Sequence, residues 1–157
     1  MGGAGLAKRL EPGAVVLHDR AIPQRRGNID HIVIAPSGVW VVDAKRYSGR
    51  VVVWQPQEGR GMLTIAGRDK TRLADGLAGQ VATVTTFLRE FGPPPPVHGA
   101  LCFVDSDLPQ GRRLTFENWH IVDAARLARR INLSPPRLDP PSVRDLADQL
   151  ARHFPPA

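Results

Sequence analysis

The sequence predicts an α/β fold in which a mixed central sheet is flanked by helices. Two β-rich runs, 29–35 and 39–47, flank the turn-forming residues Pro36-Ser37-Gly38, which indicates a hairpin. Further along, apolar residues recur at helical spacing within 74–91: Leu77, Val81, Val84 and Leu88. Strands followed by a helix, and then by further strands and helices, are typical of a sheet covered by helices.

The remaining elements follow from local composition. The expected order is a short helix within 1–12, strands at 14–18, 29–35, 39–47, 50–54 and 62–66, a helix at 74–91, strands at 97–104 and 119–122, and helices at 124–131 and 142–153. Ser48-Gly49 is expected to break the chain between two strands. Asp123 and Ser142 are expected to cap the last two helices, because their side chains can accept hydrogen bonds from free backbone N–H groups.

The length of 157 residues fits a single domain, 1–157, with a short N-terminal helix that looks truncated and a Pro-rich C-terminal tail, 154–157. The four prolines at 93–96 are expected to form a stiff connector, because a core strand follows them at once. A single cysteine, Cys102, favours a reducing compartment. No run of 18 apolar residues and no signal-peptide core is present, so we expect a cytoplasmic protein without a membrane segment.

The chain is basic, with a net charge of +6. Three of its 21 basic residues are Lys and the other 18 are Arg, whose planar guanidinium suits phosphate oxygens. Abundant Arg, Ala, Pro and Gly can equally reflect a compositional bias of the source genome, so charge alone does not decide for nucleic acid. Gly-rich phosphate loops are excluded, since the N-terminal GGAG lacks both the following Lys-Ser/Thr and a preceding strand.

Two carboxylates lie inside the apolar strands of the hairpin. Asp30 belongs to IDHIVIA and Asp43 to VWVVDAKRY. A carboxylate in such a strand is costly unless it has a cation, a metal ion or solvent as partner. Because strand side chains alternate, Asp43 and Lys45 share one face while Ala44 points to the other.

The turn leaves two registers open. If Pro36-Ser37 form a two-residue connection, Ala35 lies opposite Gly38, and counting back places Asp30 opposite Asp43. A type I turn with a bulge at Gly38 would instead place His31 opposite Asp43.

Two carboxylates and a lysine on one face suit phosphodiester hydrolysis. Carboxylate oxygens and a backbone carbonyl, here that of Ala44, are ligands that Mg²⁺ accepts while it keeps several waters. Lys45 could orient the attacking water or stabilise the transition state. The simpler alternative is that Asp43 with Lys45, or Asp30 with Arg46, are ordinary ion pairs at the end of a sheet.

A family resemblance favours the first interpretation. The hairpin segment strongly resembles the nuclease-related domain (NERD) family of the PD-(D/E)xK nuclease superfamily, in the residues GNIDHIVIAPSGVWVVDAKRYSGRV. The resemblance covers roughly Ala14 to Phe91. It implies a restriction-endonuclease-like core of order α-β-β-β-α-β and metal-dependent processing of DNA with Mg²⁺ or Mn²⁺. Asp30 would be the lone acidic ligand, Asp43-Ala44-Lys45 the D-x-K motif, and Gln80 the polar residue on the following helix.

One position departs from the family pattern. Family members usually open with a helix bearing G-x-x-G-E, whose Glu helps to bind the metal, whereas Leu6 follows Gly5 here. The departure argues against tight metal binding. An inactive nucleic-acid-binding module, or a protein-interaction domain with a protein partner, is therefore the alternative to a DNA-hydrolysing enzyme.

Residues around the hairpin are the candidates for DNA contacts. The expected backbone-phosphate contacts are Arg25, Arg26, Arg46, Arg50 and His31. For His31 the simpler alternative is a polar residue beside the core whose hydrogen bonds are satisfied within the protein. Trp40 and Trp54 lie in expected strands, and we expect both to pack in the core.

Overall fold

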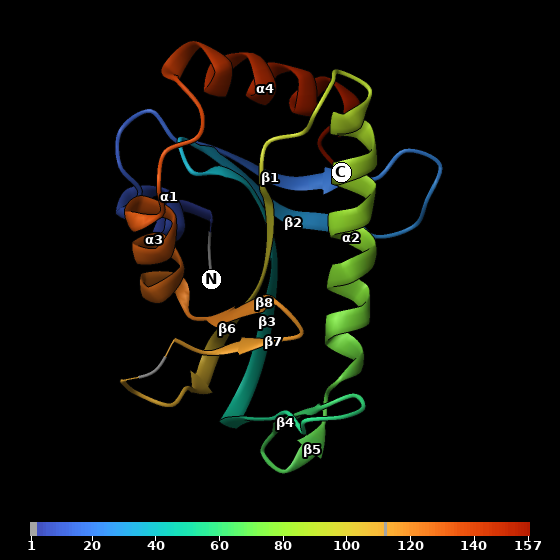
Figure 1. Cartoon of the computed structure of the whole chain (residues 1–157), viewed down its shortest axis with the longest axis vertical. Coiled ribbons are helices and arrows are strands. Elements are labelled where there is room, and N and C mark those ends of the chain that lie inside the picture. The colour runs from blue at the N-terminus through green and yellow to red at the C-terminus, as the bar shows by residue number, and fades with distance from the viewer. Residues whose placement is uncertain (1–2, 112) are drawn as a thin grey trace.

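The computed structural model describes residues 3–111 and 113–157 and shows a mixed sheet with helices on both faces (Figure 1). The elements in chain order are α1 (Gly3–Arg9), β1 (Val15–Ala21), β2 (Asn28–Ala35), β3 (Gly38–Trp54), β4 (Met62–Ile65), β5 (Arg68–Asp69), α2 (Arg72–Arg89), β6 (Val97–Asp107), β7 (Thr115–Phe116), β8 (Trp119–Val122), α3 (Ala124–Leu133) and α4 (Pro140–His153). The sheet has the order β1-β2-β3-β6-β8-β7. Strands β3, β6 and β8 are parallel, and the pairs β1–β2, β2–β3 and β7–β8 are antiparallel.

This arrangement confirms the predicted fold class. The elements α1, β1, β2, β3, α2 and β6 reproduce the order α-β-β-β-α-β, and the short strands β4 and β5 are inserted before α2. The sheet is therefore compatible with a restriction-endonuclease-like core. None of the helices in the described part of the chain is long and apolar enough to cross a membrane.

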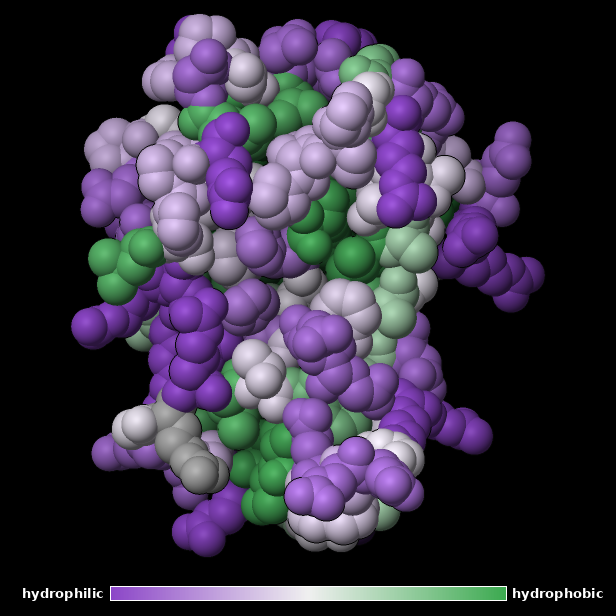
Figure 2. Space-filling view, viewed as in Figure 1, coloured by the Kyte–Doolittle hydropathy of each residue, from purple (hydrophilic) through white to green (hydrophobic). Residues whose placement is uncertain are grey.

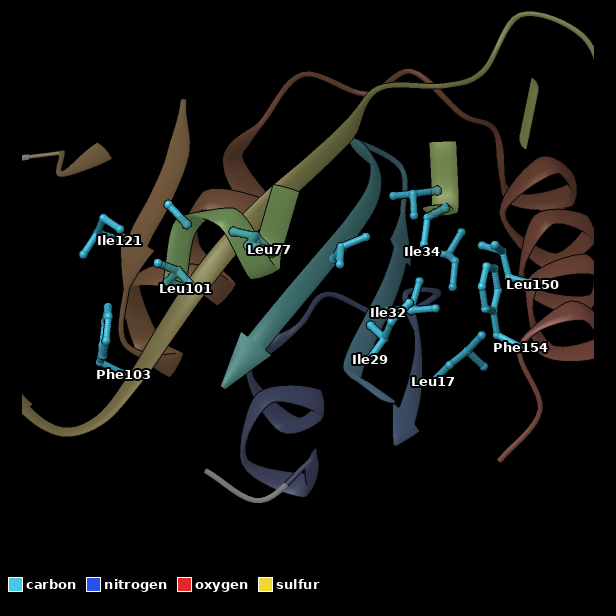
Figure 3. Close-up of a cluster of buried hydrophobic side chains, with 14 of the residues drawn as sticks. Leu17, Ile29, Ile32, Ile34, Leu77, Leu101, Phe103, Ile121, Leu150 and Phe154 are labelled. Atoms are coloured by element: carbon cyan, nitrogen blue, oxygen red, sulfur yellow. The ribbon is translucent and has the colours of Figure 1, made fainter. Parts of the chain in front are cut away.

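The sheet separates two hydrophobic cores, because successive strand residues point to opposite faces. One core packs alternate residues of β2 and β3, such as Ile34 and Val41, against α2 and α4. Figure 3 shows part of this cluster, with Leu77 of α2 above the sheet and Leu150 of α4 beside β2. The other core packs Trp40 and Val42 against α1 and α3.

The expected break at Ser48-Gly49 is wrong: β3 runs without interruption from Gly38 to Trp54. Its pairing with β6 shifts register between Arg46 and Gly49. Gly49 has a φ of 119°, which glycine adopts at no steric cost, so the irregularity bends the strand without ending it.

The expected cap of the last helix is also wrong. Asp139, not Ser142, is the N-cap of α4, and its side chain accepts a hydrogen bond from the Ser142 N–H. Two prolines at the first helical positions lack the N–H groups that a cap would otherwise have to satisfy, so the helix begins earlier than expected.

Further differences concern short or peripheral features. The two-residue strands β5 and β7 were not predicted, since they are too short to show a hydrophobic period. Trp40 is fully buried as expected, but Trp54 is 59% exposed on the outer end of β3. The tail 154–157 lies along β1: Phe154 is fully buried, and Ala21 N–H donates to Pro155 O at 2.8 Å.

Candidate functional site

The register of the hairpin follows the two-residue turn. Ala35 pairs with Gly38, and the ladder continues as far as His31 opposite Val42. The bulged alternative, in which His31 faces Asp43, is therefore wrong. The next position along the two strands brings Asp30 of β2 beside Asp43 of β3.

The Asp30 side chain contacts β3 next to Asp43. Asp30 Oδ2 accepts a hydrogen bond from the backbone N–H of Ala44 at 2.8 Å, so Asp30 reaches across to β3. The Asp30 carboxyl also lies close enough to Asp43 to help raise the pKa of Asp43. Neighbouring carboxylates repel each other, and a cation between them would remove that repulsion.

Asp43 is the buried member of the pair, with 5% of its surface exposed. Burial raises the pKa of Asp43 to about 6, Lys45 opposes the rise, and the neighbouring Asp30 adds to it. Near pH 6 the carboxyl is thus as often protonated as ionised. A divalent metal ion bound to Asp43 would compete with that proton, because a carboxyl binds metal in its deprotonated form.

Lys45 is the only basic group in ion-pair contact with Asp43 among the described residues. Its Nζ lies 3.4 Å from Asp43 Oδ1, and about a third of its side chain is exposed. Strand alternation places both residues on the face of the sheet that α2 and α4 cover. The ammonium therefore lies between the buried carboxylate and solvent.

A pocket of about 420 Å³ opens at the hairpin. Its lining consists of His18, Asp19, Asp30, His31, Ala44, Lys45, Arg46 and Val104. Of the predicted DNA contacts, His31 and Arg46 lie in this pocket. Arg46 also binds Asp105 at 2.7 Å, and both side chains are more than half exposed.

Sequence reasoning missed the contribution of β1. His18 of β1 lies opposite His31, and their Nδ1 atoms are 3.0 Å apart, so one ring donates and the other accepts. Burial lowers the pKa of His31, and His18 lowers it further. Asp19 has a φ of 49°, an irregularity directly beside Asp30. The sequence predicts the strand 14–18 that carries His18, but not its place beside β2.

Gln80 is held by α2 on the stripe that contains Leu77 and Val84, both fully buried. Helical spacing therefore turns Gln80 toward the sheet face of Asp43. Its Oε1 is buried and has no hydrogen-bond partner in the described structure. A buried carbonyl oxygen without a donor is costly, so the Gln80 side chain lowers the stability of the fold unless a donor reaches it. Gln80 does not line the 420 Å³ pocket.

The other predicted DNA contacts lie apart from the pocket. Arg25 and Arg26 are exposed in the loop between β1 and β2, which projects beside α2 in Figure 1. Arg25 lines a separate pocket with residues of α2. Arg50 is exposed on β3 beyond the register shift.

Few protein groups at the site could bind a metal ion. In the part of the chain that the structure describes, no three His, Cys, Asp or Glu side chains converge as a metal-binding group. The hairpin offers the carboxylates of Asp30 and Asp43 and the carbonyl of Ala44. This set of oxygen donors fits Mg²⁺ or Mn²⁺, since a hard cation of this size binds to one or two carboxylates and keeps several waters.

Leu6 occupies the position where the resemblance leads one to expect a glutamate. The side chain is fully buried in the core formed with Trp40 and Val42. That core lies on the face of the sheet opposite to Val39 and Val41, whose face Asp43 shares. The leucine is therefore a packing residue, and α1 contributes no carboxylate at this position.

Comparison with known families agrees with the geometry. The family model described as nuclease-related domain, NERD, matches residues 4–104, which is more than half of the chain. The matched span runs from α1 to most of β6 and includes the whole hairpin. No curated protein and no solved structure matches the chain.

Proposed function

The chain belongs to the nuclease-related domain family, and we propose that its hairpin site hydrolyses DNA phosphodiester bonds with the help of a divalent metal ion. The observation that supports the proposal most directly is the contact between Asp30 and Asp43. Their carboxylates come from neighbouring strands, and Asp30 lies close enough to help raise the pKa of Asp43. The nearby Lys45 makes the arrangement asymmetric, with negative charge inside and positive charge at the mouth.

Asp30, Asp43 and the Ala44 carbonyl would hold Mg²⁺ or Mn²⁺. When bound, the ion would neutralise charge on a phosphate and lower the pKa of a coordinated water. The Ala44 N–H fixes the orientation of Asp30 through its 2.8 Å hydrogen bond. Positioning of this kind matters because small displacements of a reacting group reduce rates strongly.

Lys45 would stabilise the negative charge that develops on the phosphate and orient the attacking water. Its partial exposure leaves the ammonium accessible to a substrate from the pocket. Gln80, with its unpaired Oε1, would position water or substrate from the helix side. His31 and Arg46 would contact DNA phosphates in the pocket, and Arg25, Arg26 and Arg50 would contact the backbone further away.

A second candidate function is a module of the same fold that binds nucleic acid without cleaving it. Leu6 favours it, because a buried leucine stands where a metal-binding glutamate is usual. This module would bind DNA through its basic surface, and binding would weaken steeply with salt yet respond little to loss of Asp43. A protein-interaction role would instead leave the protein indifferent to nucleic acid.

The experiment is a cleavage assay on supercoiled plasmid and on single-stranded DNA, with Mg²⁺ or Mn²⁺ and with EDTA. We expect metal-dependent cutting that falls by about 100-fold or more in Asp43→Asn and in Lys45→Ala, since each removes charge from the reacting centre. Matched controls are Asp148→Asn and Lys8→Ala, which remove the same charges from exposed helix positions. Both controls should cut at the normal rate.

Two results would contradict hydrolysis. One is the absence of metal-dependent cutting of either DNA by the folded wild-type protein. The other is an Asp43→Asn variant that cuts as fast as its Asp148→Asn control. Salt-sensitive DNA binding by a protein that does not cut would support the second candidate function.

A further inference from the structure

A second pocket, of about 660 Å³, lies beside α3. Its basic lining consists of Arg113, Arg126, Arg129 and Arg130, and Leu133 and Pro135 form an apolar side. Strongly hydrophilic side chains gather over α3 at the left of the face shown in Figure 2. All of these residues lie beyond the span 4–104 that matches the family. We refer to this site as the arginine pocket.

Positive charge in the arginine pocket is largely unbalanced. Arg126 binds Asp123 at 2.7 Å. Within 3–111 and 113–157, no carboxylate lies within ion-pair distance of Arg113, Arg129 or Arg130. By contrast, Arg60 elsewhere on the surface is neutralised by both Asp75 and Glu117. Guanidinium groups gathered without carboxylates repel one another unless an anion joins them.

Two of the arginines are fixed by the fold. Arg130 Nη1 donates to Leu114 O at 3.1 Å and lies 2.9 Å from Nδ1 of His120, which is buried. Desolvation, Arg130, His98 and Arg113 lower the pKa of His120 to about 4, so the ring is neutral and accepts the hydrogen bond. Arg126 Nη2 donates to Pro109 O at 3.4 Å. These bonds tie α3 to the chain that precedes β8, and the wall of the pocket is thereby preorganised.

The remaining two arginines lie at the mouth. The side chains of Arg113 and Arg129 are exposed and make no hydrogen bond or ion pair within the described structure, so their guanidinium groups keep all their donors for a ligand. Leu133, 71% exposed, stands beside them as an apolar surface. A guanidinium matches the geometry of phosphate oxygens, and its charge persists at any physiological pH.

We propose that the arginine pocket binds phosphate groups, with Arg113 and Arg129 as the residues that contact them directly. The phosphates belong either to a free nucleotide, whose base or sugar would cover Leu133, or to the backbone of a nucleic-acid strand. The site is separate from the hairpin and does not depend on hydrolysis there.

The test is a calorimetric titration of the full chain in EDTA, which removes divalent metal ions and so prevents metal-dependent cleavage of the probe. One probe is dATP, and the other is a short single-stranded oligonucleotide without terminal phosphates. The variant is Arg113→Gln with Arg129→Gln, and the matched control is Arg144→Gln with Arg152→Gln, two exposed arginines of α4 outside the pocket. Thermal unfolding verifies that both variants are folded.

We expect the pocket variant to bind one of the two probes weaker by on the order of tenfold or more, because each guanidinium lost removes charge-assisted hydrogen bonds. The control should bind like wild type. An effect on dATP identifies a nucleotide as the source of the phosphates, and an effect on the oligonucleotide alone identifies the nucleic-acid backbone. The proposal is overturned if neither probe binds the wild-type protein. It is also overturned if the pocket variant binds both probes as tightly as the control does.

Discussion

At the scale of single residues, Asp43 carries the chemistry of the hairpin. Its carboxylate is almost completely buried, and its immediate neighbours are another carboxylate and an ammonium. A buried acid in such surroundings destabilises the fold once it is ionised, unless a cation compensates. An ionised Asp43 therefore lowers the stability of the metal-free protein, and carboxyls with such a perturbed pKa are common at functional sites.

The pKa of Asp43 gives this argument a measurable sign. Since the pKa is about 6 in the folded protein and 3.8 in the unfolded reference, the folded state holds the proton more tightly. The tighter proton binding by Asp43 adds to the free energy of unfolding; this contribution is fully present below about pH 4 and is lost as the pH rises through 6. We therefore expect Asp43→Asn to stabilise the metal-free protein at pH 8 by on the order of 1–3 kcal/mol and to have a smaller effect at pH 5.

Urea denaturation in EDTA at the two pH values measures this difference. Asp148→Asn, an exposed residue of α4, is the control and should show no such dependence on pH. A stability difference between Asp43→Asn and wild type that is the same at pH 5 and pH 8 would contradict the burial argument.

At the scale of elements, the hairpin β2–β3 determines whether the two acids can meet. Its turn depends on Gly38, whose φ of 128° disfavours other residues. A Cβ at this position would lie 2.5 Å from Pro96 O, the atom that accepts the 2.9 Å hydrogen bond from Val39 N–H. The turn is thus locked to the proline-rich connector that precedes β6.

We expect Gly38→Ala to destabilise the protein by about 2 kcal/mol or more, because backbone strain and a steric clash act together. Gly13→Ala is the matched control, since Gly13 also has a positive φ, 95°, but nothing lies within 4 Å of its added Cβ. Comparing the thermal unfolding of the two variants separates the backbone strain, which both share, from the steric clash, which only Gly38→Ala has. Equal losses of stability in both would show that the contact with Pro96 has no importance.

Much of the element order was predictable from the sequence, because turns and periodic segments are local signals. The hairpin, the helix around Leu77 and Val84, and the strand containing Cys102 are where the sequence predicts them. The register of the hairpin was not predictable, because Pro36-Ser37-Gly38 suits two turns of different register. The contribution of His18 depends on which strand lies beside β2, a long-range fact that one sequence does not reveal.

At the scale of the whole molecule, the sheet divides two cores and two candidate sites. The hairpin acids share the face covered by α2 and α4, and the arginine pocket lies beside α3 on the other side. The family match covers the first of these regions and stops before the second. The positive charge behind the net charge of +6 is therefore distributed unevenly over the surface, since part of it is concentrated in the arginine pocket.

Anomalous diffraction from crystals soaked in Mn²⁺ would show whether Asp30 and Asp43 bind one divalent cation between them. We expect one strong peak at roughly 2.0–2.3 Å from an oxygen of each carboxylate, near the Ala44 carbonyl, and no such peak in crystals of Asp43→Asn. A wild-type crystal in which Mn²⁺ is bound elsewhere on the protein but not between these two side chains would contradict a shared metal site.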